Sequence, residues 1–258
     1  MYEMKGFDLH GKKAIVTGGV QGLGKAMAQA LYESGCTLCI MDINPNTPEL
    51  CKQLQTGDAP VYGVTCDLSN PETLHRGFQE AVGLLGGELD ILLNDAGVNF
   101  RKGISECTPE AWETVFKINS TAPFLLTKYA SEIMKKRGYG KIINVASMLS
   151  FLGAVGNASY AASKGSVLLQ TRSFSNELAP YGICVNAIAP GYFHTELNTP
   201  ERMAVLGEDF LKSINLRIPA GRWGEPEDLQ GTVVFLASPA SDYVTGACIN
   251  VDGGYLAR

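Results

Sequence analysis

The amino-terminal part of the chain carries a short apolar segment, residues 13–17, that runs directly into a glycine-rich turn. A helical pattern of apolar residues follows the turn through Tyr32. The glycines of the turn are Gly18, Gly22 and Gly24, a spacing that differs from the commoner Gly-x-Gly-x-x-Gly. Strand, glycine turn and helix together predict the opening of an α/β unit that binds a dinucleotide, although glycine turns also end ordinary strands.

The turn is expected to hold the pyrophosphate of such a ligand. Glycines let the backbone come close to the phosphates, and the N-terminus of the helix supplies N–H groups and the positive end of its dipole. The predicted pyrophosphate contacts are Gly18, Gln21, Gly22, Leu23 and Gly24.

Strand-like and helix-like segments alternate along the whole chain, which predicts a parallel sheet covered by helices on both faces. The expected strands are residues 13–17, 36–41, 60–65, 89–93, 142–146, 183–188 and 247–251. The 258 residues, with 45% hydrophobic content, suffice for one large core. We therefore expect a single α/β domain over residues 1–258, with a doubly wound, Rossmann-type sheet. Residues 192–216 break the alternation and are expected to form a substrate lid.

Polar residues and glycines follow several of the expected strands, so they should gather at the carboxyl edge of the sheet, where such folds bind ligands. Asp42 follows the second strand, about 20 residues after the glycine turn, where a carboxylate can accept hydrogen bonds from an adenosine ribose. It would also repel a 2′-phosphate, which predicts NAD rather than NADP. The alternative is that Asp42 only caps a turn.

Three further strand ends contribute to the same edge. Asp67 follows the third strand and either contacts the adenine or starts the next helix. Asn94 follows the fourth strand, and Pro190 and Gly191 follow the sixth. All are predicted to line the cofactor site.

Tyr160 and Lys164 are four residues apart in a predicted helix, so their side chains share one face. A free tyrosine has a pKa of roughly 10. The Lys164 ammonium is expected to lower the pKa of Tyr160, which would make the pair a general acid and base near neutral pH. Ser147 follows the fifth strand and would offer its hydroxyl to the same reacting oxygen. The alternative is that Tyr160 and Lys164 are ordinary residues of a helix without a catalytic role.

Asn119 lies among apolar residues in a long helix expected over residues 109–134. Asparagine is a poor residue for the interior of a helix, so we expect its side chain to be buried and to make specific polar contacts. These contacts belong either to the functional site or to a local structural hydrogen bond.

The composition argues against several kinds of partner. The net charge of −5 and the pI near 5.3 make nucleic acid or an anionic membrane unexpected as the main partner. No apolar signal core opens the chain and no apolar run approaches the ~20 residues of a membrane span, which predicts a cytoplasmic protein. The seven cysteines are scattered and are expected to be reduced thiols, with Cys36 and Cys39 on opposite faces of a strand. The three histidines form no ligand cluster, so no metal is expected.

Over essentially its whole length the chain resembles the short-chain dehydrogenase/reductase family. The matching residues are Thr17, Gly18, Gly22, Gly24, Asp67, Asn94, Ala96, Gly97, Asn119, Ser147, Tyr160, Lys164, Pro190, Gly191 and the run 252–254. The resemblance implies a homotetramer with two-fold symmetries. It also adds Leu68, Ala96, Gly97, Tyr160 and Lys164 to the expected cofactor contacts. One departure is Asp95, where the family usually has a second asparagine, and its role is left open.

The resemblance further implies a catalytic tetrad of Asn119, Ser147, Tyr160 and Lys164. Tyr160 takes the proton of a secondary alcohol while a hydride passes to the nicotinamide, and Ser147 holds the same oxygen. Lys164 lowers the pKa of Tyr160 and bonds the nicotinamide ribose. Asn119 anchors a water that links Lys164 to solvent.

Three strings, residues 142–151, 217–224 and 251–258, are similar to the sugar-acid dehydrogenases of the family. A pocket for a sugar acid should offer its carboxylate a guanidinium. Arg101, after the fourth strand, is the favoured candidate, and Arg217 ends the expected lid. Arg222 lies in a pattern common across the family and is expected to brace a turn. The predicted substrate contacts are Arg101, Ser147, Tyr160 and Arg217.

Two other functions stay open at this point. The fold could serve a non-catalytic dinucleotide sensor, which would not need an intact tetrad. The chain could also act on another small molecule, such as a 3-oxoacyl thioester, a steroid or a polyol. A biosynthetic NADPH reductase would be expected to place a basic residue near the adenosine ribose, where this chain has Asp42.

Overall fold

The computed structural model describes residues 5–195 and 207–258, and its centre is a seven-stranded parallel sheet. The strands are β1 (Lys13–Thr17), β2 (Thr37–Asp42), β3 (Val61–Thr65), β4 (Ile91–Asn94), β5 (Gly140–Val145), β6 (Ile183–Pro190) and β7 (Cys248–Val251). Their order is β3-β2-β1-β4-β5-β6-β7, so the chain winds from the middle to one edge and then to the other. This order confirms the predicted doubly wound fold.

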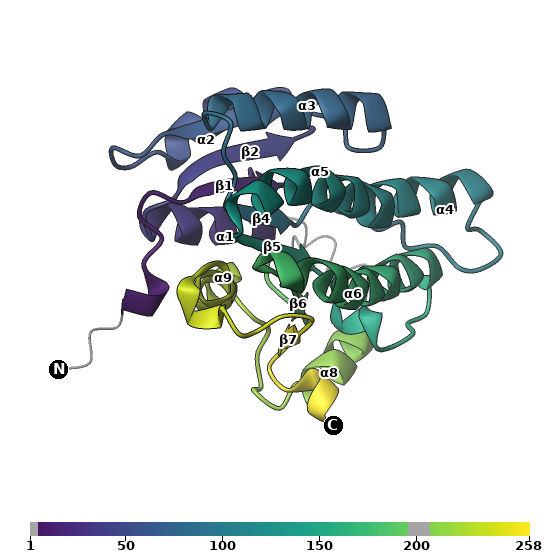
Figure 1. Ribbon diagram of the computed structural model, residues 1–258. Coiled ribbons are helices and arrows are strands. Elements are labelled where there is room, and N and C mark those ends of the chain that lie inside the picture. The colour runs from purple at the N-terminus through teal and green to yellow at the C-terminus, as the bar shows by residue number, and fades with distance from the viewer. Residues whose placement is uncertain (1–4, 196–206) are drawn as a thin grey trace.

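Helices cover both faces of the sheet (Figure 1). One face packs against α1 (Gly22–Glu33), α2 (Thr47–Leu54) and α9 (Gln230–Ala237). The other packs against α3 (Pro71–Leu84), α5 (Ala122–Arg137) and α6 (Ala158–Leu178). No helix in the described part of the chain is both long enough and apolar enough to cross a membrane.

Because both faces are covered, the strands are apolar on both sides. In β1, Ala14 and Val16 pack on the α1 side, whereas Ile15 packs on the α5 side. This arrangement explains why the strands read as continuous apolar runs in the sequence. Cys36 and Cys39 also lie on opposite sides, as predicted, and both are free thiols.

The helix expected over residues 109–134 is interrupted. α4 spans Pro109–Phe116, a π-helical turn spans Lys117–Thr121, and α5 begins at Ala122. Asn119 lies in the π-helical turn and is fully buried. The expected helical segment is therefore present, with a wider turn at Asn119 that the sequence pattern did not indicate. Turns of this kind are frequent at functional sites.

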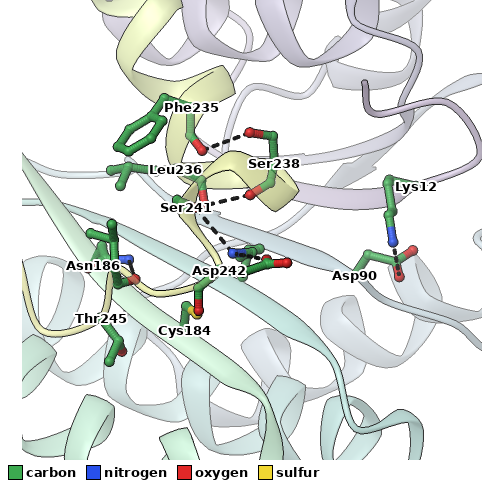
Figure 2. Close-up of polar contacts among 12 residues, drawn as sticks. Lys12, Asp90, Cys184, Asn186, Phe235, Leu236, Ser238, Ser241, Asp242 and Thr245 are labelled. Atoms are coloured by element: carbon green, nitrogen blue, oxygen red, sulfur yellow. Dashed lines mark hydrogen bonds and ion pairs between the residues drawn. The ribbon is translucent and has the colours of Figure 1, made fainter. Parts of the chain in front are cut away.

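The segment between α9 and β7 is fastened to the sheet by buried polar contacts (Figure 2). Nζ of Lys141, a fully buried residue near the amino end of β5, lies 2.7 Å from Oδ1 of Asp242 and 3.1 Å from Oγ of Ser241. Nδ2 of Asn186 in β6 donates to the carbonyl oxygen of Val244 at 2.7 Å. Since Lys141 is the second residue of β5, this cluster lies away from the carboxyl edge and stabilises the fold.

The expected lid, residues 192–216, lies partly outside the described residues, which omit 196–206. Its last part was expected to be irregular but forms the helix α8 (Glu208–Arg217). Ile214 of α8 packs with Trp223 and Tyr255 in a small core cluster near the carboxyl end of the chain. Burial of this apolar face explains why the segment is helical despite its mixed polarity.

Candidate active site

A cleft of about 480 Å³ runs along the carboxyl edge of the sheet. It includes the ends of β1 and β4, which are neighbours although they are not consecutive, and such points of reversal are where folds of this type bind ligands. The predicted residues that line the cleft are Gly18, Gln21, Gly22, Leu23, Asp42, Asp67, Leu68, Ala96, Gly97, Ser147, Tyr160, Lys164, Pro190 and Gly191. The predicted residues outside its lining are Gly24, Asn94, Arg101, Asn119 and Arg217.

The glycine turn between β1 and α1 has a shape that other residues would not allow. Gly18 has a φ of +71°, and a Cβ atom there would lie 2.8 Å from Cα of Ala96. Gly22 has a φ of +57° and open space where a Cβ would be. Gly24 points inward, and a Cβ there would collide with the carbonyl oxygen of Gly18 and the carboxylate of Asp95. Gly24 therefore serves the packing of the turn and does not line the cleft.

The residues at this turn fit the pyrophosphate of a dinucleotide. The first N–H groups of an α-helix have no acceptor within the helix. Gln21, the residue before α1, makes no side-chain cap to them, and Gly22 and Leu23 line the cleft. The open backbone at Gly22 and the positive end of the α1 dipole would suit a phosphate group at this position.

Asp42 and Asp67 lie at the part of the cleft formed by β2 and β3. Oδ1 of Asp42 accepts the Asn44 N–H at 3.1 Å, and Oδ2 accepts the Val20 N–H at 3.5 Å. Oδ1 of Asp67 accepts the Ser69 N–H at 2.8 Å. Both acids thus brace a turn and also line the cleft, so the structural and the ligand-binding alternatives are compatible at each position.

Asn94 supports the carboxyl edge from within the fold. Its Nδ2 donates to Oδ1 of Asn144 at 2.8 Å, and Nδ2 of Asn144 donates to Oγ1 of Thr171 at 2.9 Å. These buried amides connect β4, β5 and α6. The side chain of Asn94 therefore holds neighbouring elements together and does not line the cleft.

Ser147 and Tyr160 place two hydroxyl groups side by side in the cleft. Ser147 directly follows Ala146 at the end of β5, and its buried Oγ accepts the Leu149 N–H at 3.1 Å. The Ser147 hydroxyl also forms a hydrogen bond with the Tyr160 hydroxyl, which comes from the first turn of α6. This pair can hold one oxygen of a substrate and move its proton.

The pKa of Tyr160 is raised, not lowered as predicted from Lys164. Burial of the phenol is the main cause, because it disfavours the phenolate. The hydrogen bond with Ser147 opposes this rise, the charge of Asp95 adds to it, and the charge of Arg101 reduces it.

Lys164 is turned toward β5 in this structure. Its Nζ donates to the carbonyl oxygen of Val145 at 2.6 Å and lies 5.8 Å from the centre of the Tyr160 ring. Burial lowers the pKa of Lys164 to about 8, and the negative charge of Asp95 opposes this effect. Lys164 is not among the groups that shift the pKa of Tyr160, so the expected effect is not found and burial of the phenol decides the direction.

The Asn119 side chain holds the loop after β4. Its Oδ1 accepts the Val98 N–H at 2.8 Å, and its Nδ2 donates to the Val98 carbonyl oxygen at 2.9 Å and to Oγ of Ser163 at 3.1 Å. This geometry favours the local structural hydrogen bond over a direct part of the side chain in the cleft.

Arg101 is exposed on the loop that follows β4. Two contacts hold this loop beside the start of α6: Nδ2 of Asn99 donates to Oδ1 of Asn157 at 2.8 Å, and the Lys102 N–H donates to the Gly156 carbonyl oxygen at 3.0 Å. These contacts place Arg101 on a loop beside the helix that carries Tyr160.

The other two arginines make different contacts. Cζ of Arg217 lies 4.5 Å from the ring centre of Tyr255, near the carboxyl end of the chain. Arg222 binds both carboxylate oxygens of Asp228, at 2.6 and 3.0 Å, and also the Trp223 carbonyl oxygen. Arg222 thus braces a turn, as predicted.

Sequence analysis missed several lining residues and gave no role to one more. The missed lining residues include Ile43, Val98, Asn99, Ile118, Val145, Ala146 and Thr195. Of these residues only Ala146 ends a predicted strand, and that position was the available signal for it. Asp95 was noticed only as a departure from the family pattern, yet it also lines the cleft.

Comparison with known proteins identifies the family. A family profile described as enoyl-(acyl carrier protein) reductase matches residues 18–256. The chain is 42% identical to the 2-dehydro-3-deoxy-D-gluconate 5-dehydrogenase of Bacillus subtilis, covering 98% of this chain and 97% of that protein. It is 44% identical to the enzyme of the same name from Dickeya dadantii, covering 98% of each.

A solved structure agrees with these matches. The gluconate 5-dehydrogenase from Burkholderia cenocepacia, in complex with NADP and tartrate, superposes with a TM-score of 0.91 at 35% identity, covering 98% of each chain. The chain belongs to the short-chain dehydrogenase/reductase family, whose enzymes act on alcohol and ketone groups with a nicotinamide dinucleotide.

Proposed function

We propose that this enzyme is an NAD-dependent dehydrogenase that interconverts a secondary alcohol and a ketone on a sugar acid of the 2-dehydro-3-deoxy-D-gluconate or gluconate type. The names of the relatives support the substrate class. The observation that carries the proposal is the position of Arg101 on the loop after β4, which hydrogen bonds of its neighbours Asn99 and Lys102 hold beside the start of α6, the helix of Tyr160. A guanidinium near the reacting hydroxyl is what the carboxylate of a sugar acid requires.

In this proposal the reaction is divided between the cofactor and the chain. The nicotinamide, when bound, supplies the site that accepts or donates the hydride. The glycine turn holds the pyrophosphate, Asp42 binds the adenosine ribose, and Lys164 binds the nicotinamide ribose. Tyr160 takes the proton of the substrate hydroxyl, and Ser147 donates a hydrogen bond to the same oxygen as its negative charge develops.

A substrate panel tests the proposed function. Formation of NADH or NADPH is measured with sugar acids, neutral polyols and steroid alcohols, and oxidation of NADH or NADPH with 3-oxoacyl thioesters. We expect the highest kcat/KM with a sugar acid and NAD⁺. If a neutral alcohol, a steroid or a thioester is the better substrate, the sugar-acid proposal fails while the family assignment stands.

Replacing Arg101 with alanine is expected to raise KM for the sugar acid by roughly tenfold or more. The reason is the loss of a charge-assisted hydrogen bond, which contributes about 1.5–3 kcal/mol. KM for a neutral polyol and for NAD⁺ should change little. Steady-state kinetics with all three ligands make the comparison.

Lys102→Ala is the matched control, because Lys102 is the next residue in the same loop and is also an exposed cation. Its KM for the sugar acid should stay within about twofold of wild type, the range of a distant surface charge. A specific contact of Arg101 with the carboxylate would be contradicted if the two substitutions raised KM for the sugar acid equally. It would also be contradicted if Arg101→Ala raised KM for the polyol as much as KM for the sugar acid.

We also propose a homotetramer, as the family resemblance implies. Large apolar side chains are exposed on the helices that would form such contacts: Trp112 on α4, Phe124 on α5 and Leu169 on α6 are 39–61% exposed. Covering them would bury apolar surface. Light scattering should report a mass near four times the chain mass of 27.6 kDa. A stable monomer at micromolar concentration would overturn the assembly.

A further inference from the structure

Among the described residues that line the cleft, Asp95 is the one carboxylate that neither the tetrad nor the expected cofactor contacts include. It directly follows β4, and Oγ1 of Thr17 accepts the N–H groups of Asp95 and Ala96, both at 3.2 Å. These bonds fix the start of the loop against the end of β1. The carboxylate of Asp95 is turned toward the first turn of α1, where its Oδ2 lies so close to Gly24 that a Cβ atom there would collide with it. Asp95 therefore lies at the same helix N-terminus as the expected phosphate site.

The Asp95 carboxylate and the pyrophosphate of a bound dinucleotide would face different N–H groups of the first turn of α1. With Gln21 before the helix, Gly22, Leu23 and Gly24 are its first three residues. Gly22 and Leu23 line the cleft, whereas Gly24 faces Asp95. A helix N-terminus carries only about half a unit of positive charge. A carboxylate behind the turn and a pyrophosphate in front of it therefore compete for the same electrostatic stabilisation and repel each other.

The charged groups around Asp95 add to this electrostatic repulsion. The acid that acts on its charge is Asp42 at the end of β2, and the groups on α6 that interact with it are Lys164 and Tyr160. β1 contributes only the neutral Thr17, and α1 only the Gly24 backbone. Lys164 is thus the one cation that acts on Asp95 among the described residues, against the carboxylate of Asp42 and the two negative charges that a bound pyrophosphate would add.

We propose that Asp95 is a positioning residue that couples dinucleotide binding to proton uptake. Its carboxylate braces the glycine turn when the phosphate site is empty and takes a proton from solvent when the pyrophosphate enters. The protonated carboxyl group keeps its place at the turn without a negative charge. The proton returns to solvent when the dinucleotide leaves.

Asp95 is the acid of the site that is best suited to such a change. Burial raises its pKa to about 7, Lys164 opposes the rise, Asp42 adds to it, and the Gly24 backbone opposes it. The negative charges of a bound pyrophosphate would raise the pKa of Asp95 further, so that its carboxylate would take up a proton near neutral pH.

The test compares wild type with Asp95→Asn, which keeps the size of the side chain, removes its charge and restores the residue usual in the family. NADH affinity is measured by fluorescence titration between about pH 6 and about pH 8, with NADPH used instead if it binds more tightly. No substrate is needed, so the result does not depend on the sugar-acid proposal. We expect wild-type affinity to fall about fivefold more over this range than that of the variant, because only the wild type loses the Asp95 proton.

Lys164 also titrates near this range, so a second measurement identifies the acid directly. Infrared difference spectra at about pH 8 should show the carbonyl stretch of a protonated carboxyl group appearing when NADH binds to wild type, and no such band for Asp95→Asn. Asp67→Asn, which removes another acid of the same cleft, should keep both the band and the pH dependence. A missing band in wild type, the same band in Asp95→Asn, or equal pH dependence of the two proteins would overturn the proposal.

Discussion

Replacing Tyr160 with phenylalanine is expected to lower kcat by at least ~10²-fold, the usual scale of general acid–base catalysis. The substitution keeps the ring in its place in α6 and deletes only the hydroxyl that bonds Ser147. The affinity for NADH should be largely kept, because the glycine turn and Asp42 are untouched. Stopped-flow or steady-state turnover together with an NADH titration measures both quantities.

The matched control is Tyr181→Phe. Tyr181 is half-exposed, lies beyond the end of α6 and contacts Lys135, away from the cleft. This variant should retain wild-type turnover, which excludes a general effect of losing a phenol. Near-normal turnover of Tyr160→Phe would remove Tyr160 from the mechanism and with it the proposed tetrad.

A clear preference for NAD⁺ over NADP⁺ is the second large effect expected. The Asp42 carboxylate lines the cleft at the end of β2, where the adenosine ribose is expected. One like-charge contact with a 2′-phosphate at ~4 Å and an effective dielectric constant near 20 costs on the order of 4 kcal/mol before screening. The ratio of kcat/KM for the two cofactors measures the preference. Because a solved relative contains NADP, the outcome is informative in either direction.

Asp42→Asn should reduce this ratio by at least about tenfold, since a repulsion of more than 1.4 kcal/mol is removed. Asp67→Asn is the control, because Asp67 is another acid of the same cleft that caps a turn before α3. Asp67→Asn should change kcat/KM for NAD⁺ and for NADP⁺ to a similar extent. Equal kcat/KM for NAD⁺ and NADP⁺ in wild type would show that Asp42 does not face the ribose.

The order of the elements and the edge that carries the site could be predicted from the sequence. Continuous apolar runs indicated strands buried on both faces, and their alternation with helical patterns left a parallel sheet as the only regular solution. In such a sheet every strand ends at the same edge, so Gly18, Asp42, Ser147 and Gly191 had to gather there. The cleft contains all four.

The direction and environment of individual side chains were decided only by the tertiary structure. Sequence position placed Asn94, Asn119 and Gly24 near the site, but their contacts with Asn144, Val98 and Asp95 depend on how distant segments pack.

The charge states depend on packing in the same way. Four-residue spacing brought Lys164 near Tyr160, yet burial raises the pKa of Tyr160, because desolvation of a charge depends on all surrounding atoms and not on one neighbour in the sequence. For the same reason the sequence could name Asp95 as unusual, whereas only the fold placed its carboxylate at the N-terminus of α1.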